Sequence, residues 1–392
     1  MENATVANRT ASMATNSGTE SCPGRAGGLV WVCIWKNLLS VRRRYRSHPG
    51  PATPPLVGTA ALWQGAARQQ GRKMSPSRHV LLSSMKDEGP FILEFVAHHL
   101  VLGFDAIHIA SNDCSDGTDL LLDALAAGGA ITHTRNPVKP GEIPQHRAYQ
   151  RLRRRQPVDE ADWVMVLDID EFLFVPHGAG RVADLTALAE DEIDVISLSA
   201  LNFGTSDAED WQPGRVTQQF DLRLPAQSEA NRPVKSLSRG QGRWGGLHNH
   251  HPVEFRGQGA ARYLLGSGKT GEVPEGARMW HHLRRLKPED VGHELGWYNH
   301  YPIKSLESYM LRRQRGRGAR PAGDPQTRHD EAYWARFAAA DIPDRRLNDR
   351  YGAATEAQMA ALLALPGVAE AQARTEALTR QRLQALFREL DG

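Results

Sequence analysis

The chain's 392 residues are enough for one large domain or two modest ones, and 40% hydrophobic with 24% charged residues is ordinary for a soluble globular protein. The net charge of +3 is unevenly spread: residues 1–73 hold ten Lys or Arg and two Glu, whereas the remainder holds 38 basic and 43 acidic residues. Because most of the chain is therefore acidic, its basic pI does not favour nucleic-acid binding.

Residues 1–76 differ in composition from the rest of the chain. They open with a polar stretch, and their apolar run around Trp31 is much shorter than the roughly 20 residues that span a bilayer. Most of the positive charge follows this run, whereas in a signal peptide it comes first. We expect a disordered extension. Membrane-surface anchoring through Trp31 and Trp35, or a translation start at Met74, are the alternatives.

The three cysteines, Cys22, Cys33 and Cys114, match neither a disulfide framework nor a zinc motif. A reducing compartment is the simpler interpretation. We therefore expect a cytoplasmic protein without a transmembrane helix, at most peripherally associated with a membrane.

From His79 onward, apolar runs alternate with helical patterns. Strands are predicted at 79–84, 106–110, 130–134, 163–167 and 195–201. Helices are predicted to begin near Pro90, Asp116 and Pro144. This alternation indicates βαβ units and a mostly parallel sheet flanked by helices. After about residue 205 the pattern becomes irregular, and helical patterns return from Ser305 and over 355–390.

Three polar clusters follow predicted strands: Lys86-Asp87-Glu88, Asn112-Asp113, and Asp168 to Glu171. In parallel sheets, ligands bind beyond the carboxyl ends of the strands, so these clusters are expected to converge. Asp168 and Asp170 are two apart and would share one side of an extended chain. Paired carboxylates are suitable ligands for a hard cation such as Mg²⁺ or Mn²⁺. The alternative is that an Asp-x-Asp after a strand has no ligand role.

Four segments, in this chain order, resemble family 2-like and family 92-like glycosyltransferases. They are Lys86-Asp-Glu-Gly-Pro-Phe91, Ser111 to Thr118, Asp162 to Phe172, and Asn299-His-Tyr-Pro-Ile-Lys-Ser305. The likeness covers about 79–320. It implies a GT-A-type, Rossmann-like fold and a metal-dependent, inverting transfer of a sugar from a nucleotide-sugar donor to a carbohydrate or glycan acceptor.

The resemblance also implies roles for individual residues. Glu88 and the turn at 115–118, which contains Asp116, would face the nucleotide, and Asp168 with Asp170 would bind the metal. Two departures leave the nucleotide contacts open: Asp87 stands where an asparagine is more usual, and Ser111 where an aspartate is often found. The full set of expected nucleotide-binding residues is Glu88, Asn112, Asp113, Asp116 and Lys304. Asp116-Gly117-Thr118 could instead be only a helix cap and turn.

The second half of the chain supplies further candidates. By analogy with GT-A enzymes, His300 is a third metal ligand, and Lys304 could reach a phosphate as a point charge. His248 and His250, two apart, could share one face of a strand, and His250 and Glu254 are the candidates for catalytic acid–base work. The arginines at 312, 313, 315 and 317 could neutralise a diphosphate, although a solvated basic face is the simpler interpretation.

Two other functions remain open. A nucleotidyltransferase would need a glycine-rich basic loop after the first strand, where this chain has Ser83-Ser-Met-Lys-Asp-Glu88. A non-catalytic carbohydrate-binding or scaffold protein could use the nine tryptophans, but it would have no need for clustered carboxylates. We divide the chain into an extension at 1–76, a glycosyltransferase-like domain at 77–320 with an irregular acceptor region, and a helical segment at 321–392.

Overall fold

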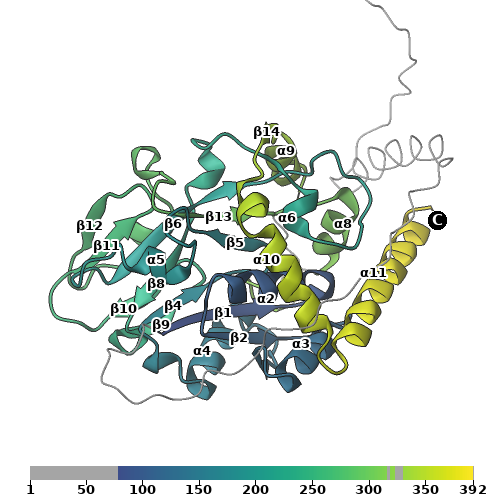
Figure 1. The fold of residues 1–392 in the computed structure, drawn as a ribbon, viewed down its shortest axis with the longest axis horizontal. Helices are drawn as coiled ribbons and strands as arrows, with labels where there is room; N and C mark the ends of the chain where they lie inside the picture. The colour runs from purple at the N-terminus through teal and green to yellow at the C-terminus, as the bar shows by residue number, and fades with distance from the viewer. Residues whose placement is uncertain (1–77, 316–317, 323–329, 392) are drawn as a thin grey trace, which may run out of the picture. The chain divides into compact units, whose positions relative to one another are not determined.

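The computed structural model describes residues 78–315, 318–322 and 330–391 (Figure 1). The expected extension at 1–76 and Arg317 lie outside the described residues. The described residues up to Leu386 form one compact unit, and the described residues from Phe387 onward are grouped apart from it. Among the described helices, none is both long and apolar enough to cross a membrane.

A parallel sheet forms the first half of the fold. Strand β1 (His79–Met85) pairs with β2 (Ala106–Ser111) on one side and β4 (Trp163–Val166) on the other, and β2 pairs with β3 (Thr132–Arg135), all parallel. Helices α2 (Ile92–Val101), α3 (Thr118–Ala127) and α4 (Pro144–Arg155) connect these strands. The predicted βαβ alternation is therefore confirmed, with element ends displaced by one or two residues.

The side chains of β1 show why this strand lies at the centre of the sheet. Its residues alternate between the two faces, and both faces are covered. Val80 and Leu82 pack with Tyr149 and other residues of α4, whereas Leu81 joins the large cluster on the opposite face. An uninterrupted apolar run is the pattern expected of such a strand.

The second half of the sheet is mixed. Antiparallel β8 (Val234–Arg239) lies between β4 and β6 (Val195–Asn202). Strand β11 (Ala261–Leu265) runs parallel to β6 and antiparallel to β12 (Thr270–Val273). Strand β13 (Trp297–His300) pairs parallel with β6 and antiparallel with β5 (Glu171–Phe174). The whole is a mixed, mostly parallel central sheet flanked by helices.

The later helices pack on this sheet. Figure 1 shows α10 (Arg346–Leu363) alongside α2, and its Leu347 and Tyr351 belong to the main core cluster. The other long C-terminal elements are α8 (Leu306–Arg315), α9 (Glu331–Ala338) and α11 (Val368–Asp391). The remaining short elements are η1 (Gly89–Phe91), η2 (Val158–Glu160), α5 (Val182–Thr186), α6 (Val216–Gln219), β7 (Leu222–Arg223), η3 (Glu229–Asn231), η4 (Gln241–Arg243), β9 (Trp244–Leu247), β10 (Pro252–Phe255), α7 (Trp280–Leu283), η5 (Pro288–Asp290) and β14 (Ile342–Pro343). The division at residue 320 stays a prediction.

Candidate functional site

The three polar clusters follow neighbouring strands. In the sheet, β4, β1 and β2 are adjacent and parallel, so the segments after Met85, Ser111 and Val166 leave the sheet at the same edge. This is the edge at which ligands bind in open parallel sheets.

Asp116 joins two of these segments. Its Oδ2 accepts a hydrogen bond from the backbone N–H of Gly89 at 2.9 Å, and its Oδ1 accepts one from Thr118 at 2.9 Å. The backbone N–H of Glu88 donates to Thr118 Oγ1 at 2.7 Å. Burial raises the pKa of Asp116, while these hydrogen bonds oppose the rise. Asp116 thus holds the loops after β1 and β2 together at the site.

Asn112 and Asp113 continue directly from β2. The Asn112 side-chain amide donates to Asp113 Oδ2 at 3.0 Å, and Asp113 has a φ of +46°, in the left-handed region. Neither residue lines the pocket described below, whereas Glu88, Asp116 and Lys304 do. The structure therefore brings three of the five predicted nucleotide-binding residues to one cavity.

Asp168 is held by two side chains that the sequence reasoning did not identify. Lys235 of β8 places its Nζ 2.9 Å from Asp168 Oδ2, and the amide of Gln145 donates to Oδ1 at 2.9 Å. Lys235 also lies 2.6 Å from Glu171 Oε2 and is itself fully buried. Burial lowers the pKa of Lys235, but the two carboxylates raise it on balance, so it is a permanent cation among these acids.

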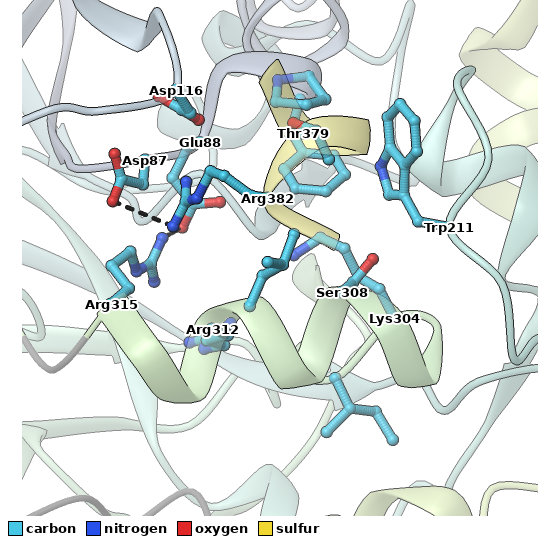
Figure 2. Close-up of a pocket in the computed structure, with 14 residues that line it drawn as sticks. Asp87, Glu88, Asp116, Trp211, Lys304, Ser308, Arg312, Arg315, Thr379 and Arg382 are labelled. Carbon is cyan, nitrogen blue, oxygen red and sulfur yellow. Dashed lines mark hydrogen bonds and ion pairs between the residues drawn. The ribbon is translucent and has the colours of Figure 1, made fainter. Parts of the chain in front are cut away.

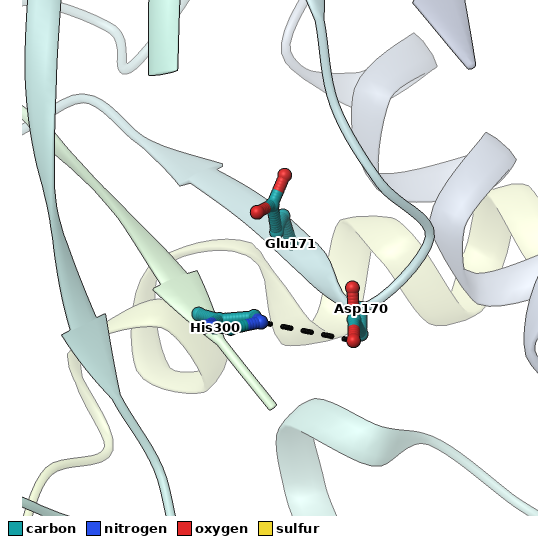
Figure 3. Close-up of side chains that lie close together, drawn as sticks. All are labelled: Asp170, Glu171 and His300. Atoms are coloured by element: carbon teal, nitrogen blue, oxygen red, sulfur yellow. Dashed lines mark ion pairs between the residues drawn. The ribbon is translucent and has the colours of Figure 1, made fainter. Parts of the chain in front are cut away.

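Asp170, Glu171 and His300 lie close together at the start of β5 and the end of β13 (Figure 3). One ligand atom from each residue lies within 4.8 Å of the others. The strand register pairs His300 with Glu171, and the backbone N–H of Tyr301 donates to the carbonyl of Asp170 at 2.8 Å. The pairing of β5 with β13 therefore fixes the acidic segment against the histidine.

The hydrogen bonds of His300 set its tautomer. The side-chain nitrogen of Asn202 donates to Ala230 and Asn231, which leaves Asn202 Oδ1 to accept from His300 Nδ1 at 2.7 Å. Burial lowers the pKa of His300, although the contact with Asp170 opposes this. With Nδ1 bonded to Asn202, the other ring nitrogen, Nε2, faces Asp170 Oδ2 at 3.7 Å. A carboxylate oxygen and an imidazole nitrogen placed in this way can bind one cation together.

A pocket adjoins this cluster (Figure 2). The loop after β1 forms its floor. Lys304, just before α8, and Ser308, Arg312 and Arg315 of α8 lie along one side, and Thr379 and Arg382 of α11 lie along the other. Arg312 also forms an ion pair with Asp170, and Arg315 pairs with Glu88. The Nζ of Lys304 lies 4.6 Å from the centre of the Phe91 ring. The pocket and the acidic cluster are thus linked through Arg312.

The interpretation of the arginines as a solvated face was wrong for two of them. The side chains of Arg312 and Arg315 are only 15% and 16% exposed because both turn inward to pair with carboxylates. A sequence signal existed: positions 308, 312 and 315 share one helical face. For Lys235 no such signal existed, because only Val234 and Leu237 are apolar in the six residues of β8.

The two catalytic candidates lie in different surroundings. His248 and His250 are not on a strand as expected, because β9 ends at Leu247 and the histidines form the turn before β10. His250 Nδ1 lies 2.8 Å from the carbonyl of Val234, next to Lys235 in sequence. Glu254 has a 64% exposed side chain that pairs with Arg256. The structure does not bring Glu254 to the acidic cluster.

The chain was compared with protein-family models and with known proteins. No family model matches the chain. A glycosyltransferase family 92 protein from Arabidopsis thaliana is 25% identical over 129 residues, which is 32% of this chain and 22% of that protein. The chain thus matches less than a quarter of that relative's length.

Solved structures are more distant. Glucosyl-3-phosphoglycerate synthase from Mycobacterium tuberculosis, in complex with Mn²⁺, UDP and phosphoglyceric acid, is 15% identical with a TM-score of 0.25 over 42% of this chain and 56% of that one. TarS from S. aureus is 10% identical with a TM-score of 0.25 over 42% and 28%. Scores this low carry no argument. The sequence match confirms the resemblance to family 92-like glycosyltransferases.

Proposed function

We propose that this protein transfers a sugar from a nucleotide-sugar donor to a carbohydrate or glycan acceptor, with a divalent cation at Asp170 and His300. The observation that carries the proposal is the geometry of the cluster: Asp170, Glu171 and His300 each place a ligand atom within 4.8 Å of the others, beside the pocket. The distant likeness to a family 92 glycosyltransferase supports the same reaction class.

The donor set fits a divalent cation. Asp170 and Glu171 offer carboxylate oxygens and His300 offers a nitrogen, which suits Mn²⁺ or Mg²⁺ with water completing the shell. Asn202 Oδ1 bonds the ring nitrogen that faces away from the cluster, Nδ1 of His300, as outer-shell partners of metal-bound histidines do. Asp168, proposed from sequence as a ligand, is bound by Lys235 and Gln145, so a role through water or through the donor suits it better than direct ligation. When bound, the cation would offset negative charge on the leaving nucleoside diphosphate.

The chain's own residues would do the remaining work on the donor. Arg312 and Lys304 lie between Asp170 and Glu88 and can pair with the diphosphate as the bond to the sugar breaks. Glu88, Asp116 and the segment with Asn112 and Asp113 form the proposed nucleoside side. Their carboxylates and backbone can bind the ribose and base.

The acceptor side rests on fewer contacts. We propose an inverting transfer, which needs a base for the acceptor hydroxyl. His250 is the better placed candidate of the two, since its Nε2 is left to accept a proton when Nδ1 donates to Val234, although burial and the nearby Lys235 hold its pKa well below the usual value. Glu254 has no support from its position.

A binding screen tests the proposal. Thermal unfolding is measured with UDP, GDP, ADP and CDP, each with and without Mn²⁺. A ligand that binds the folded state raises the midpoint. We expect one diphosphate to stabilise the protein only when Mn²⁺ is present. In D170N this stabilisation is lost, whereas D159N, a partly exposed aspartate paired with Arg153, keeps it.

The same screen separates the alternatives. A scaffold or carbohydrate-binding protein would show no metal-dependent effect of any diphosphate. A nucleotidyltransferase would release pyrophosphate from a nucleoside triphosphate and a sugar phosphate, which is assayed in parallel. Either result overturns the proposal.

A further inference from the structure

A helix from the end of the chain closes the pocket. Thr375 of α11 is fully buried against the loops that carry Glu88 and Asp116. A Cβ added at Gly89 would come within 2.6 Å of the Thr375 side chain, and one at Gly117 within 3.4 Å. Glycine at position 89 thus permits the close approach of α11 to the floor of the site.

The same face of α11 reaches the pocket. Thr375, Thr379 and Arg382 are spaced four and three apart, so they lie on one side of the helix, and the last two line the cavity (Figure 2). Arg382 Nη2 lies 3.4 Å from Asp87 Oδ2. Among the described residues this is the guanidinium's one ion pair, and no hydrogen bond accompanies it. Most of its five N–H donors are therefore available to a ligand.

Two buried polar atoms on the pocket wall also lack partners. The indole Nε1 of Trp211, a residue only 6% exposed, and Nε of Arg312 have no hydrogen-bond partner among the described residues. Buried donors without acceptors are costly, so both point to an occupant that brings acceptors. Phe91, Trp211 and Leu311 give the same cavity flat and apolar surfaces. A nucleoside with its phosphates has both kinds of surface.

We propose that Arg382 of α11 contacts the base of the donor nucleotide, which makes the C-terminal helix a specificity-determining part of the donor site. This rests on the proposed function and adds a residue to it. Arg312 pairs with Asp170 and so lies at the end of the pocket where the metal is proposed. Arg315, about one helical turn further along α8, pairs with Glu88, and Arg382 pairs with Asp87. These two arginines therefore lie at the opposite end of the pocket.

The chemistry of the guanidinium defines the class of base. Its paired N–H groups match the adjacent O6 and N7 acceptors of guanine, one N–H can also bind a single carbonyl oxygen of uracil, and its plane can stack on a ring. A base with carbonyl acceptors is therefore expected to bind better than adenine.

Calorimetry with Mn²⁺ tests this inference on the full chain. Two probes are compared: the nucleoside diphosphate that the wild type binds most tightly, and pyrophosphate, which has no base. R382Q should weaken nucleoside diphosphate binding about tenfold or more, because the hydrogen bond between the charged guanidinium and the base is lost. Pyrophosphate has no base, so its affinity should change by no more than about twofold. R382K, which keeps the charge, should recover part of the loss. R374Q, on the exposed face of the same helix, is the matched control.

Each failure has a distinct signature. If R382Q binds the nucleoside diphosphate as tightly as R374Q does, Arg382 has no donor role and the proposed function stands. If R382Q loses affinity for both probes equally, α11 acts only by supporting the fold, and the inference is wrong. If the wild type binds no nucleoside diphosphate with Mn²⁺, the proposed function fails and the inference fails with it.

Discussion

The ammonium of Lys235 lies 2.6 Å from Glu171 Oε2, and both side chains are buried. The contact joins β8 to the start of β5, and the same ammonium is shared with Asp168 at 2.9 Å. A cation supplied by the chain therefore partly balances the acidic segment.

Removing that cation should destabilise the fold. K235M leaves the buried Glu171 and the partly exposed Asp168 without their shared cation, which costs about 3–5 kcal/mol of unfolding free energy. The double variant K235M/E171Q should recover part of this loss because one of the stranded charges is also removed. Urea denaturation of the wild type, both single variants and the double variant measures the cycle. Additive single effects would show that the pair does not interact.

Arg312 is expected to act on the diphosphate. R312M removes the guanidinium beside Asp170 and should weaken binding of Mn²⁺-pyrophosphate by about tenfold or more, since a charge-assisted contact contributes about 1.5–3 kcal/mol. Calorimetry gives the affinity. R336M, on the exposed side of α9, serves as the control. Unchanged pyrophosphate affinity in R312M would place the phosphates elsewhere.

Asn202 is expected to affect the affinity for Mn²⁺ although it is not a proposed metal ligand. Its Oδ1 fixes the Nδ1–H tautomer of His300, so N202L should weaken Mn²⁺ binding by about 10–100-fold. Asn202 also bonds Asn231, so far-ultraviolet circular dichroism must first show that N202L is folded. Mn²⁺ titration by calorimetry is the readout. Equal affinity in the folded variant would mean that His300 is not a ligand.

The fold should lose stability as the solution is acidified. Burial lowers the pKa of His98 to about 4 from 6.5, so the native state keeps this ring neutral while the unfolded chain binds a proton. The stability that His98 contributes is present above pH 6.5 and is lost as the pH falls towards 4, by about 3 kcal/mol at most. The ring lies against the rings of Phe172 and Tyr351.

Denaturation at pH 7.5 and pH 5 measures the effect. In H98Q the side chain can still donate to Leu173 but cannot titrate, so the difference between the two pH values should shrink. H281Q, at an exposed histidine, should keep the wild-type difference. An identical pH dependence in H98Q would contradict the assignment.

Local patterns predicted the first half of the fold well. The apolar run of β1 and the prolines and glycines that bound its neighbouring helices act within a few residues, so chain order reveals them. The placement of Asp170 after a buried strand was equally visible. By contrast, β8 lies antiparallel between β4 and β6 and comes from a distant part of the chain. Nothing in its sequence specifies that pairing.

The site divides in the same way. Its acidic groups lie in the loops after β1, β2 and β4, which the predicted strands already located, whereas its cationic groups, Lys235, Arg312 and Arg382, come from three elements far apart in sequence. A carboxylate in a loop and an arginine on a helix each look solvated until the fold brings them together. Glu254 shows the converse: it lies near a histidine cluster in sequence, yet it faces solvent.

The most direct measurement is release of nucleoside diphosphate from a nucleotide sugar by purified protein, with and without Mn²⁺. The donor is chosen by the diphosphate that stabilises the protein. Wild type and D159N should release the nucleoside diphosphate only when Mn²⁺ is present. D170N, shown to be folded by circular dichroism, should lose at least about 99% of the rate, because one electrostatic contact to the leaving group is worth about 10²-fold or more. Wild-type turnover in D170N, or release that is indifferent to metal, would contradict a metal-dependent glycosyltransferase.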